Sequence, residues 1–314
     1  MALISIVIPV YYNAGSLPAL AERLAALAES QPGHRFEFVY VDDGSGDNSF
    51  EALKAIAERE PRARVVKLAR NFGSNTAILA GMTYATGDCV AFIAADLQDP
   101  PETLAEMIAR WEAGTKVVLA ARRDRHGDPW TTRLFAGLFN WLFKKLVFDG
   151  FSPQGIGFFL VDRQVADVLI RCNEKNAHLI GLILWSGYRY EIVEYDRGER
   201  EHGKSRWTFR KKFKYFIDAF AAFSYLPLRL ASALGLLLAG AGGLYAVVVI
   251  AVRLLNQVPV PGWTALMIVV LLTSGAQLLI LGILGEYLWR NFDATRTRPL
   301  FIVEAVLDPT RHEA

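Results

Sequence analysis

The chain is poor in cysteine. Of its 314 residues only two are cysteines, Cys89 beside a predicted strand and Cys172 in a predicted helix. They give neither the ligand spacing of a metal site nor a disulfide framework. We expect both to be reduced residues of the core.

The amino terminus lacks the marks of a signal peptide. It reads Met-Ala-Leu-Ile-Ser-Ile-Val-Ile-Pro, an apolar run that is too short and has neither a basic segment before it nor a cleavage site after it. We interpret it as a first strand and expect this half of the chain to be cytoplasmic. Internal repeats and low-complexity segments are also absent from the sequence.

Charge is almost absent from two long stretches, 230–252 and 264–288. Each is long enough to cross the roughly 30 Å hydrocarbon layer of a bilayer, so we predict two transmembrane helices. The sequence therefore divides into a globular domain over 1–228, a membrane region over 229–289 and a tail over 290–314. Basic residues flank the pair of spans on both sides, which by the positive-inside rule predicts a multi-pass protein of the cytoplasmic membrane with both ends cytoplasmic.

The net charge of +2 hides a basic cluster just before the first apolar stretch. Its members are Arg197, Arg200, Lys204, Arg206, Arg210, Lys211, Lys212 and Lys214. Segments 133–148 and 207–226 combine such cations with apolar residues at helical spacing, which favours amphipathic helices in the membrane interface that meet anionic lipid. The alternatives are helices that cover a core and a solvated basic face.

Short apolar runs alternate with helical patterns through the first 121 residues. The runs are at 4–10, 36–41, 65–68, 90–95 and 117–121, and the helical patterns at 16–30, 47–60, 74–86 and 101–113. This βαβ order predicts an α/β domain with a largely parallel sheet. Ligands of such sheets bind at the carboxyl ends of the strands, where six polar side chains are expected: Tyr11, Asn13, Asp42, Asp43, Asp96 and Gln98.

The segments Val-Asp-Asp-Gly-Ser at 41–45 and Asp-Leu-Gln at 96–98 carry the chemistry. Carboxylate and amide oxygens hold divalent cations, and such a cation stabilises the charge that develops on a departing nucleoside diphosphate. A strand-end aspartate is more often part of a turn or a helix cap. Two such segments at matching places in a βαβ chain favour a nucleotide-sugar site.

These motifs resemble those of family 2 glycosyltransferases with a GT-A fold, specifically the bacterial two-span polyprenyl-phosphate glycosyltransferases related to dolichol-phosphate mannose synthase. The resemblance covers nearly the whole chain. It rests on Ile-Pro-Val-Tyr-Tyr-Asn at 8–13, 41–45, Arg-Asn-Phe-Gly at 70–73, Asp-Leu-Gln-Asp-Pro-Pro-Glu at 96–102, Gly-Lys-Ser-Arg-Trp at 203–207, Gly-Glu-Tyr-Leu at 285–288 and Arg-Pro-Leu-Phe-Ile-Val at 298–303.

The resemblance implies a role for each motif. The nucleotide would be held by Pro9, Tyr11, Asn13, Asp42 and Asp43. Asp96 and Gln98 would hold Mg²⁺ or Mn²⁺ against the diphosphate, with Asp96 also counted as catalytic. The lipid phosphate would be held by Arg122, Arg133, Arg200, Lys204 and Ser205. Arginine forks and lysine suit phosphate oxygens, although any one of these cations can also be a surface residue.

The sequence departs from the family pattern at two positions. Ala94 stands where relatives usually have the first aspartate of an Asp-X-Asp motif, and Gly157 stands where many bacterial relatives have aspartate. Each change removes a carboxylate from the expected site. We expect an altered donor site that still functions.

The hypothesis is an inverting, metal-dependent transfer of a sugar, UDP-linked, to undecaprenyl phosphate at the cytoplasmic face. A processive synthase is disfavoured because Trp207 lies outside a Gln-X-X-Arg-Trp motif. A non-catalytic scaffold and a lipid-sugar flippase remain alternatives. Small residues in the first span favour a homo-oligomer, and no nucleic-acid partner is expected.

Overall fold

The computed structural model describes residues 1–123, 156–172, 174, 179–198, 226–255, 262–296 and 298–308. They form two compact units, a sheet domain that includes 298–308 and a pair of long helices. The amphipathic segments predicted at 133–148 and 207–226 lie outside the described residues, apart from position 226, and so do Arg133, Arg200, Lys204 and Ser205.

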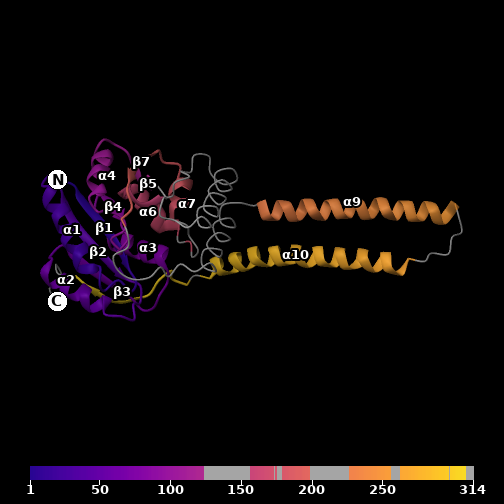
Figure 1. Ribbon diagram of the computed structural model, residues 1–314, viewed down its shortest axis with the longest axis horizontal. Coiled ribbons are helices and arrows are strands. Elements are labelled where there is room, and N and C mark those ends of the chain that lie inside the picture. The colour runs from indigo at the N-terminus through magenta and orange to yellow at the C-terminus, as the bar shows by residue number, and fades with distance from the viewer. Residues whose placement is uncertain are drawn as a thin grey trace. The chain divides into compact units, whose positions relative to one another are not determined.

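The sheet domain is built on one eight-stranded sheet (Figure 1). Its strands are β1 Leu3–Val10, β2 Arg35–Asp42, β3 Ala63–Leu68, β4 Cys89–Phe92, β5 Val117–Arg122, β6 Ile156–Asp162, β7 Tyr190–Tyr195 and β8 Val303–Leu307. Their spatial order is β7-β5-β6-β4-β1-β2-β3-β8. The five predicted strands are present, and β6, β7 and β8 were not predicted.

Most neighbours in the sheet are parallel, as the βαβ order predicts. β1 pairs in parallel with β2 and β4, β2 with β3, and β5 with β7. Only β6 and β8 run in the opposite direction. The carboxyl ends of β1 to β5 and β7 therefore lie at one edge of the sheet, which we call the carboxyl edge, and their amino ends lie at the amino edge.

Helices cover both faces of this sheet (Figure 1). They are α1 Leu17–Ser30, α2 Ser49–Arg59, α3 Ser74–Tyr84, α4 Thr103–Glu112, α6 Arg163–Cys172 and α7 Leu179–Trp185. Helices α1, α2 and α4 bury their apolar positions against the isoleucines of β1, whereas α3 packs on β1 and β2 with α6 beside it. Successive side chains of each strand therefore point in turn to two cores, one under α1, α2 and α4 and the other under α3 and α6.

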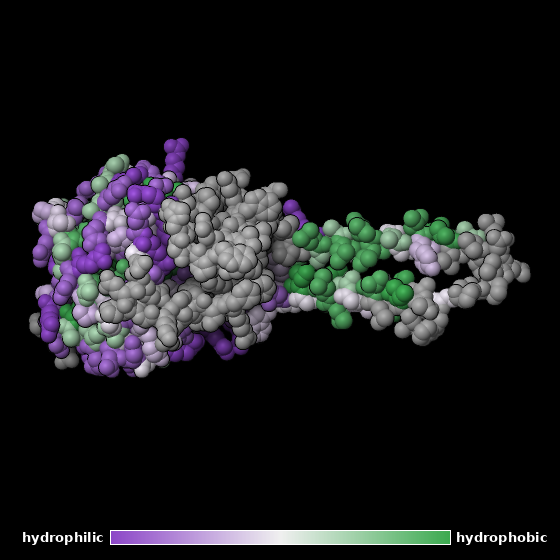
Figure 2. All heavy atoms as spheres, in the orientation of Figure 1, coloured by the Kyte–Doolittle hydropathy of each residue, from purple (hydrophilic) through white to green (hydrophobic). Residues whose placement is uncertain are grey.

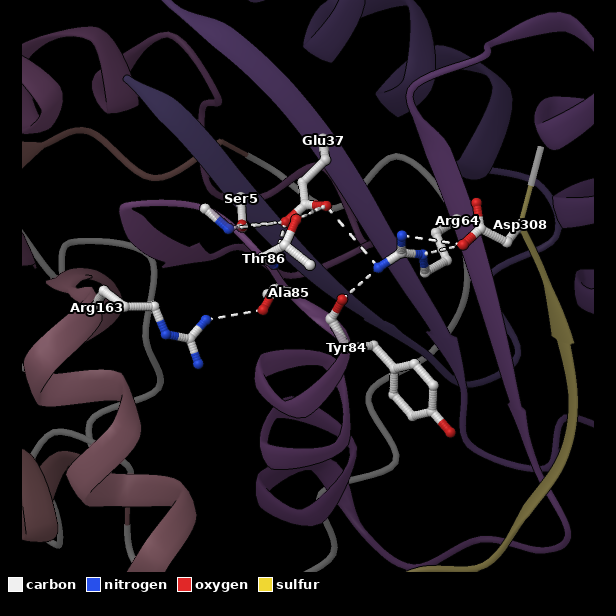
Figure 3. A network of polar contacts seen from close by, with 9 residues as sticks. Ser5, Glu37, Arg64, Tyr84, Ala85, Thr86, Arg163 and Asp308 are labelled. Carbon is white, nitrogen blue, oxygen red and sulfur yellow. Dashed lines mark hydrogen bonds and ion pairs between the residues drawn. The ribbon is translucent and has the colours of Figure 1, made fainter. Parts of the chain in front are cut away.

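The amino edge holds a network of paired polar groups (Figure 3). Glu37 of β2 accepts hydrogen bonds from the Ser5 hydroxyl and from the Thr86 hydroxyl, the latter at 2.9 Å. Arg64 of β3 lies 4.0 Å from the Glu37 carboxylate and donates to Asp308, just after β8, at 3.0 Å. The charges near the first residues of β2 and β3 and after the last residue of β8 are therefore compensated locally.

The second unit consists of α9 Leu226–Leu255 and α10 Trp263–Thr295, which contact each other. Both satisfy the length and hydropathy expected of membrane-spanning helices, over Leu228–Tyr245 and Ile268–Thr295. Their exposed surface is apolar (Figure 2), with Leu236 77% and Leu278 70% exposed. Large apolar surfaces of this kind need a lipid or protein environment.

Candidate functional site

The loop after β1 meets the loop after β2 at the carboxyl edge. The backbone amide of Asp43 donates to the Val10 carbonyl at 2.9 Å. The Tyr12 amide donates to the Ser45 hydroxyl at 3.1 Å, and Tyr12 has a positive φ of 59°. A bulky residue in the left-handed region costs free energy and is typical of functional sites.

Three other predicted nucleotide-binding residues lie in or beside the loop after β1. The Asn13 side-chain oxygen accepts from the Tyr11 amide at 3.1 Å, and the Asn13 amide donates to the Ser49 hydroxyl at 2.9 Å. Pro9 is inside β1 opposite Val41, one residue before the strand ends. The predicted group is thus brought together. Ser45 and Ser49, which were not among the predicted binding residues, hold the loop after β1 in place.

Asp43 is a buried carboxylate that holds the turn before α3. Its two oxygens accept from the backbone amides of Phe72 at 2.7 Å and Gly73 at 3.0 Å. Burial raises the pKa of Asp43 to about 6, and the two amide hydrogen bonds oppose this shift. The Arg-Asn-Phe-Gly motif therefore contributes to the carboxyl edge through backbone amides that bind Asp43.

Asp42 has one oxygen available for a ligand. Its Oδ1 accepts from the Ser45 amide at 3.1 Å, whereas Oδ2 is buried and has no hydrogen-bond partner among the described residues. Burial raises the pKa of this carboxyl. Gly44 follows with φ +67°, and a Cβ there would lie 2.5 Å from the Arg70 carbonyl carbon, so the turn requires glycine. A buried acceptor without a donor can receive a hydrogen bond from a ligand or from an ordered water.

The loop after β4 carries the predicted metal ligands. β4 ends at Phe92, three residues earlier than predicted, and the Ile93 amide still bonds the Val7 carbonyl at 3.1 Å before the chain turns away. Between Asp96 and Gln98, Leu97 has a positive φ of 60°. This second strained residue gives the loop its sharp turn.

The loop after β4 is joined to the loop after β1. The hydroxyl of Ser16, a buried residue, donates to the Ala95 carbonyl at 2.6 Å. The Asp96 carboxylate accepts from the Gln98 amide at 3.3 Å. One continuous hydrogen-bonded surface thus links the predicted nucleotide residues to the predicted metal ligands.

The carboxyl end of β7 contributes residues that the site prediction omitted. The Tyr195 hydroxyl donates to Asp99 Oδ1 at 2.5 Å, and both residues are buried. Arg197 Nη2 donates to Gln98 Oε1 at 2.6 Å, and Arg197 Nε lies 3.9 Å from Asp99. These partners are 96 and 99 residues apart in sequence, so local pattern carried no signal of their contact.

Arg122, the last residue of β5, is beside this group. Its Nε is buried without a hydrogen-bond partner among the described residues. Burial raises the pKa of Asp99, against the effect of the Tyr195 hydroxyl and of the Arg197 and Arg122 charges. Burial and the nearby Arg122 charge lower the pKa of Arg197. The Nε of Arg122 can therefore still donate a hydrogen bond, and its role toward a phosphate stays a prediction.

The donor set fits a hard divalent cation that also binds a substrate phosphate. Asp96 and Gln98 offer oxygen atoms, the ligands that Mg²⁺ and Mn²⁺ prefer. An amide oxygen can accept one hydrogen bond, as from Arg197, and bind a cation with its second lone pair. The described part of the chain contains no group of three or more His, Cys, Asp or Glu side chains able to hold a metal. Asp96 and Gln98 alone would leave positions of such a cation open to water or to substrate oxygens.

Residues 5–165 match the family model "Glycosyl transferase family 2". The uncharacterized glycosyltransferase YkcC of Bacillus subtilis is 40% identical over 96% of this chain and 93% of its own length. The SfII prophage-derived bactoprenol glucosyl transferase of Shigella flexneri is 33% identical over 96% of this chain and 97% of its own.

Solved structures share the fold at low identity. The mannosyltransferase PcManGT from Pyrobaculum calidifontis, solved with GDP-Man and Mn²⁺, is 18% identical with a TM-score of 0.51, over 91% of this chain and 87% of its own. Mannosyl-3-phosphoglycerate synthase from Rubrobacter xylanophilus is 20% identical with a TM-score of 0.50, over 83% and 78%. The predicted GT-A fold is confirmed, and the chain belongs to glycosyltransferase family 2.

Proposed function

We propose that this glycosyltransferase moves one sugar from a UDP-linked donor to undecaprenyl phosphate at the cytoplasmic face of the membrane. The observation that carries the proposal is the arrangement of polar residues at the carboxyl edge. Two buried aspartates, the loop with Asp96 and an arginine at the end of β5 belong to this edge, and two residues of its loops have a positive φ. The bactoprenol glucosyl transferases that match the full chain support a polyprenyl phosphate as acceptor.

The nucleotide is assigned to the loops after β1 and β2. Asp42 Oδ2, buried beside the turn at Ser45, accepts a hydrogen bond from the base or ribose. Asp43 keeps the turn at Phe72 and Gly73 against this surface. Tyr11 and Pro9 form the rest of the surface to which the nucleotide is assigned.

The diphosphate is assigned to the loop after β4. Mg²⁺ or Mn²⁺, when bound to Asp96 and Gln98, supplies positive charge to the leaving diphosphate. The structure of PcManGT with GDP-Man and Mn²⁺ supports a divalent cation in this fold. With Ala94 in place of a carboxylate, Asp96 carries the larger share of the interaction.

The acceptor is assigned to Arg122 together with Arg133, Arg200, Lys204 and Ser205. A phosphomonoester has a second pKa of about 6, so its oxygen is a nucleophile near neutral pH without a general base. That oxygen bonds to C1 of the sugar as the bond from C1 to the diphosphate breaks, and the nucleoside diphosphate leaves with the electron pair. The residues act by positioning and by charge stabilisation, and a single displacement inverts the anomeric centre.

The test is transfer of radiolabelled sugar to undecaprenyl phosphate by the purified full chain in detergent, from a panel of UDP- and GDP-sugars. We expect one UDP-sugar to give a lipid-linked product with Mn²⁺ or Mg²⁺ and no product with EDTA. The product's anomeric configuration, read by NMR, should be opposite to that of the donor.

A variant with both Asp96→Ala and Gln98→Ala provides the matched control. Product that persists in this variant, or in EDTA, contradicts the assigned metal site. Absence of product from every donor, with the chain folded and monodisperse, contradicts the assigned reaction.

A further inference from the structure

The segment that follows β7 is fastened to the loop after β4 at three points. Tyr195 donates to Asp99 at 2.5 Å, Arg197 donates to Gln98 Oε1 at 2.6 Å, and the Gly198 amide donates to the Gln98 carbonyl at 2.8 Å. Side chain and backbone of Gln98 are both held. Such bonds to a ligand residue restrict its rotamer and fix the direction of its second lone pair.

The position of β7 is itself fixed by the sheet. β7 pairs in parallel with β5, with Arg122 opposite Tyr195, and the Arg123 amide donates to the Tyr195 carbonyl at 2.9 Å. The ring of Tyr195 packs at 5.0 Å from that of Phe158. A rigid strand therefore presents the three contacts to a loop that contains the strained Leu97.

Gly157 leaves the space that Tyr195 occupies. A Cβ at this position would lie 1.9 Å from the Tyr195 hydroxyl and 3.4 Å from Asp99 Oδ1. A side chain at 157 and the bond between Tyr195 and Asp99 are thus mutually exclusive in this geometry. At Gly157 the sequence departs from the family pattern, and the absence of a side chain there leaves room for the contact between Tyr195 and Asp99.

We propose that Tyr195, Arg197 and Gly198 form a clamp on Gln98 and Asp99, and that Tyr195 and Arg197 are positioning residues of the donor and metal site. The inference rests on the proposed function, because it assigns the purpose of the clamp to metal-dependent donor binding. Arg197 lies three residues before Arg200, so the clamp also connects the donor loop in sequence to the predicted acceptor segment.

The test is UDP binding to the full chain in detergent by calorimetry, with Mn²⁺ and with EDTA. We expect Tyr195→Phe and Arg197→Ala each to weaken Mn²⁺-dependent binding by about tenfold, the usual loss when a residue behind a metal ligand is removed. Binding in EDTA, which depends on the loops after β1 and β2, should change by less than about twofold, and Arg197→Lys should recover part of the loss because lysine can still donate to Gln98.

Tyr188→Phe and Arg189→Ala, before β7 at its opposite end, are the matched controls and should bind like the unaltered chain. Mn²⁺-dependent affinities of Tyr195→Phe and Arg197→Ala that equal those of these controls overturn the clamp. So does an equal loss with Mn²⁺ and with EDTA, because a general structural defect has that signature.

Gly157→Ala gives an independent test. It should weaken Mn²⁺-dependent UDP binding strongly in the unaltered chain and less in the Tyr195→Phe background, where the hydroxyl at 1.9 Å is absent. Gly33→Ala, at a position where a Cβ meets nothing within 4 Å, is the control. Equal losses in both backgrounds contradict the assigned contact.

Hydrogen exchange separates failure of the clamp from failure of the proposed function. The amides of residues 97–99 should exchange faster in Tyr195→Phe and Arg197→Ala than in the unaltered chain. Absence of UDP binding in the unaltered chain under both conditions contradicts the proposed donor site. The clamp is then judged by exchange alone, and unchanged rates at 97–99 overturn it.

Discussion

The two edges of the same sheet use similar residues in opposite ways. At the amino edge, Glu37 is bonded to hydroxyls and faces Arg64, which in turn pairs with Asp308. At the carboxyl edge, Asp42 Oδ2 and Arg122 Nε are buried without partners among the described residues, as are the Tyr40 hydroxyl within β2 and His34 Nδ1 just before it. Paired polar groups stabilise a fold, whereas buried groups without partners cost stability until water or a ligand supplies the missing bond.

Backbone strain follows the same division. The non-glycine residues with positive φ in the described ranges, Tyr12 and Leu97, both belong to loops of the carboxyl edge. Strain persists only where surrounding contacts enforce it, here the Ser45 hydroxyl and the clamp from β7. The comparison predicts that substitutions at the carboxyl edge alter activity and those at the amino edge alter stability.

The largest effect is expected for Asp96→Asn. The variant keeps the shape of the side chain but removes the negative charge offered to a divalent cation. Loss of charge stabilisation on the leaving group should lower sugar transfer by about 100-fold or more, as for other electrostatic catalytic groups. Transfer rate and melting temperature measured on the same preparation test this, and the melting temperature should not fall.

Glu58→Gln on the exposed face of α2 is the isosteric control for Asp96→Asn. It removes a carboxylate charge from the same domain at a distance from the carboxyl edge. Equal activity losses in the two variants would show that net charge, and not position, determines the rate.

Asp43 should make stability depend on pH in an unusual direction. Burial raises its pKa from 3.8 to about 6, so the folded chain holds the proton more tightly than the unfolded chain. The favourable contribution is complete below about pH 4 and is lost as the pH rises through about 6, a change on the order of 2 kcal/mol. Above that pH the ionised carboxylate is retained at a cost to stability.

Melting temperatures of the unaltered chain and of Asp43→Asn, compared between about pH 4 and about pH 7, test this assignment. The difference between the two proteins should change across this range in favour of the variant as pH rises, since asparagine does not titrate. A difference that is constant with pH would place the pKa of Asp43 near its ordinary value.

Local sequence was sufficient to predict the first five strands, the four helices between them and the two apolar helices. Alternation and hydropathy are properties of short segments, and the structure preserves them in β1 and α10 alike. The three later strands were not predicted. β8 pairs with β3, more than 230 residues earlier, and such long-range pairing leaves no periodic signal that identifies the partner.

The site shows the same limit. Asp42, Asp43, Asp96 and Gln98 follow apolar strands, so parallel topology alone brings them to one edge. Tyr195 and Arg197 were not assigned to it, because β7 was not predicted and their partners are about 100 residues away. Gly157 was noticed only as a missing carboxylate, and the structure supplies the tyrosine that takes its space.

A moderate effect on stability is expected for Glu37→Gln at the amino edge. The amide keeps the size of the side chain but places an NH₂ group against hydroxyl and amide donors of Ser5 and Thr86. The lost hydrogen bonds should reduce the free energy of unfolding by about 1–2 kcal/mol. Thermal unfolding measures it, with Glu22→Gln on exposed α1 surface as control. Sugar transfer at a permissive temperature should be unchanged, and a loss there would contradict the division between the edges.

The smallest effect is expected for Lys67→Met at the edge between β3 and β8. Lys67 Nζ lies 2.7 Å from Glu304, and the two side chains are 25% and 50% exposed. Exposed ion pairs contribute less than about 1 kcal/mol, and methionine keeps the apolar stem that packs near Phe50. The melting temperature should fall slightly at low salt and not at all at about 1 M salt, where screening removes the pair's attraction. The backbone hydrogen bonds between β3 and β8, from Val65–Leu307 to Leu68–Val303, are the same in the unaltered chain and in Lys67→Met. A larger fall in melting temperature that salt does not suppress would therefore mean that side-chain packing, and not these backbone bonds, holds β8.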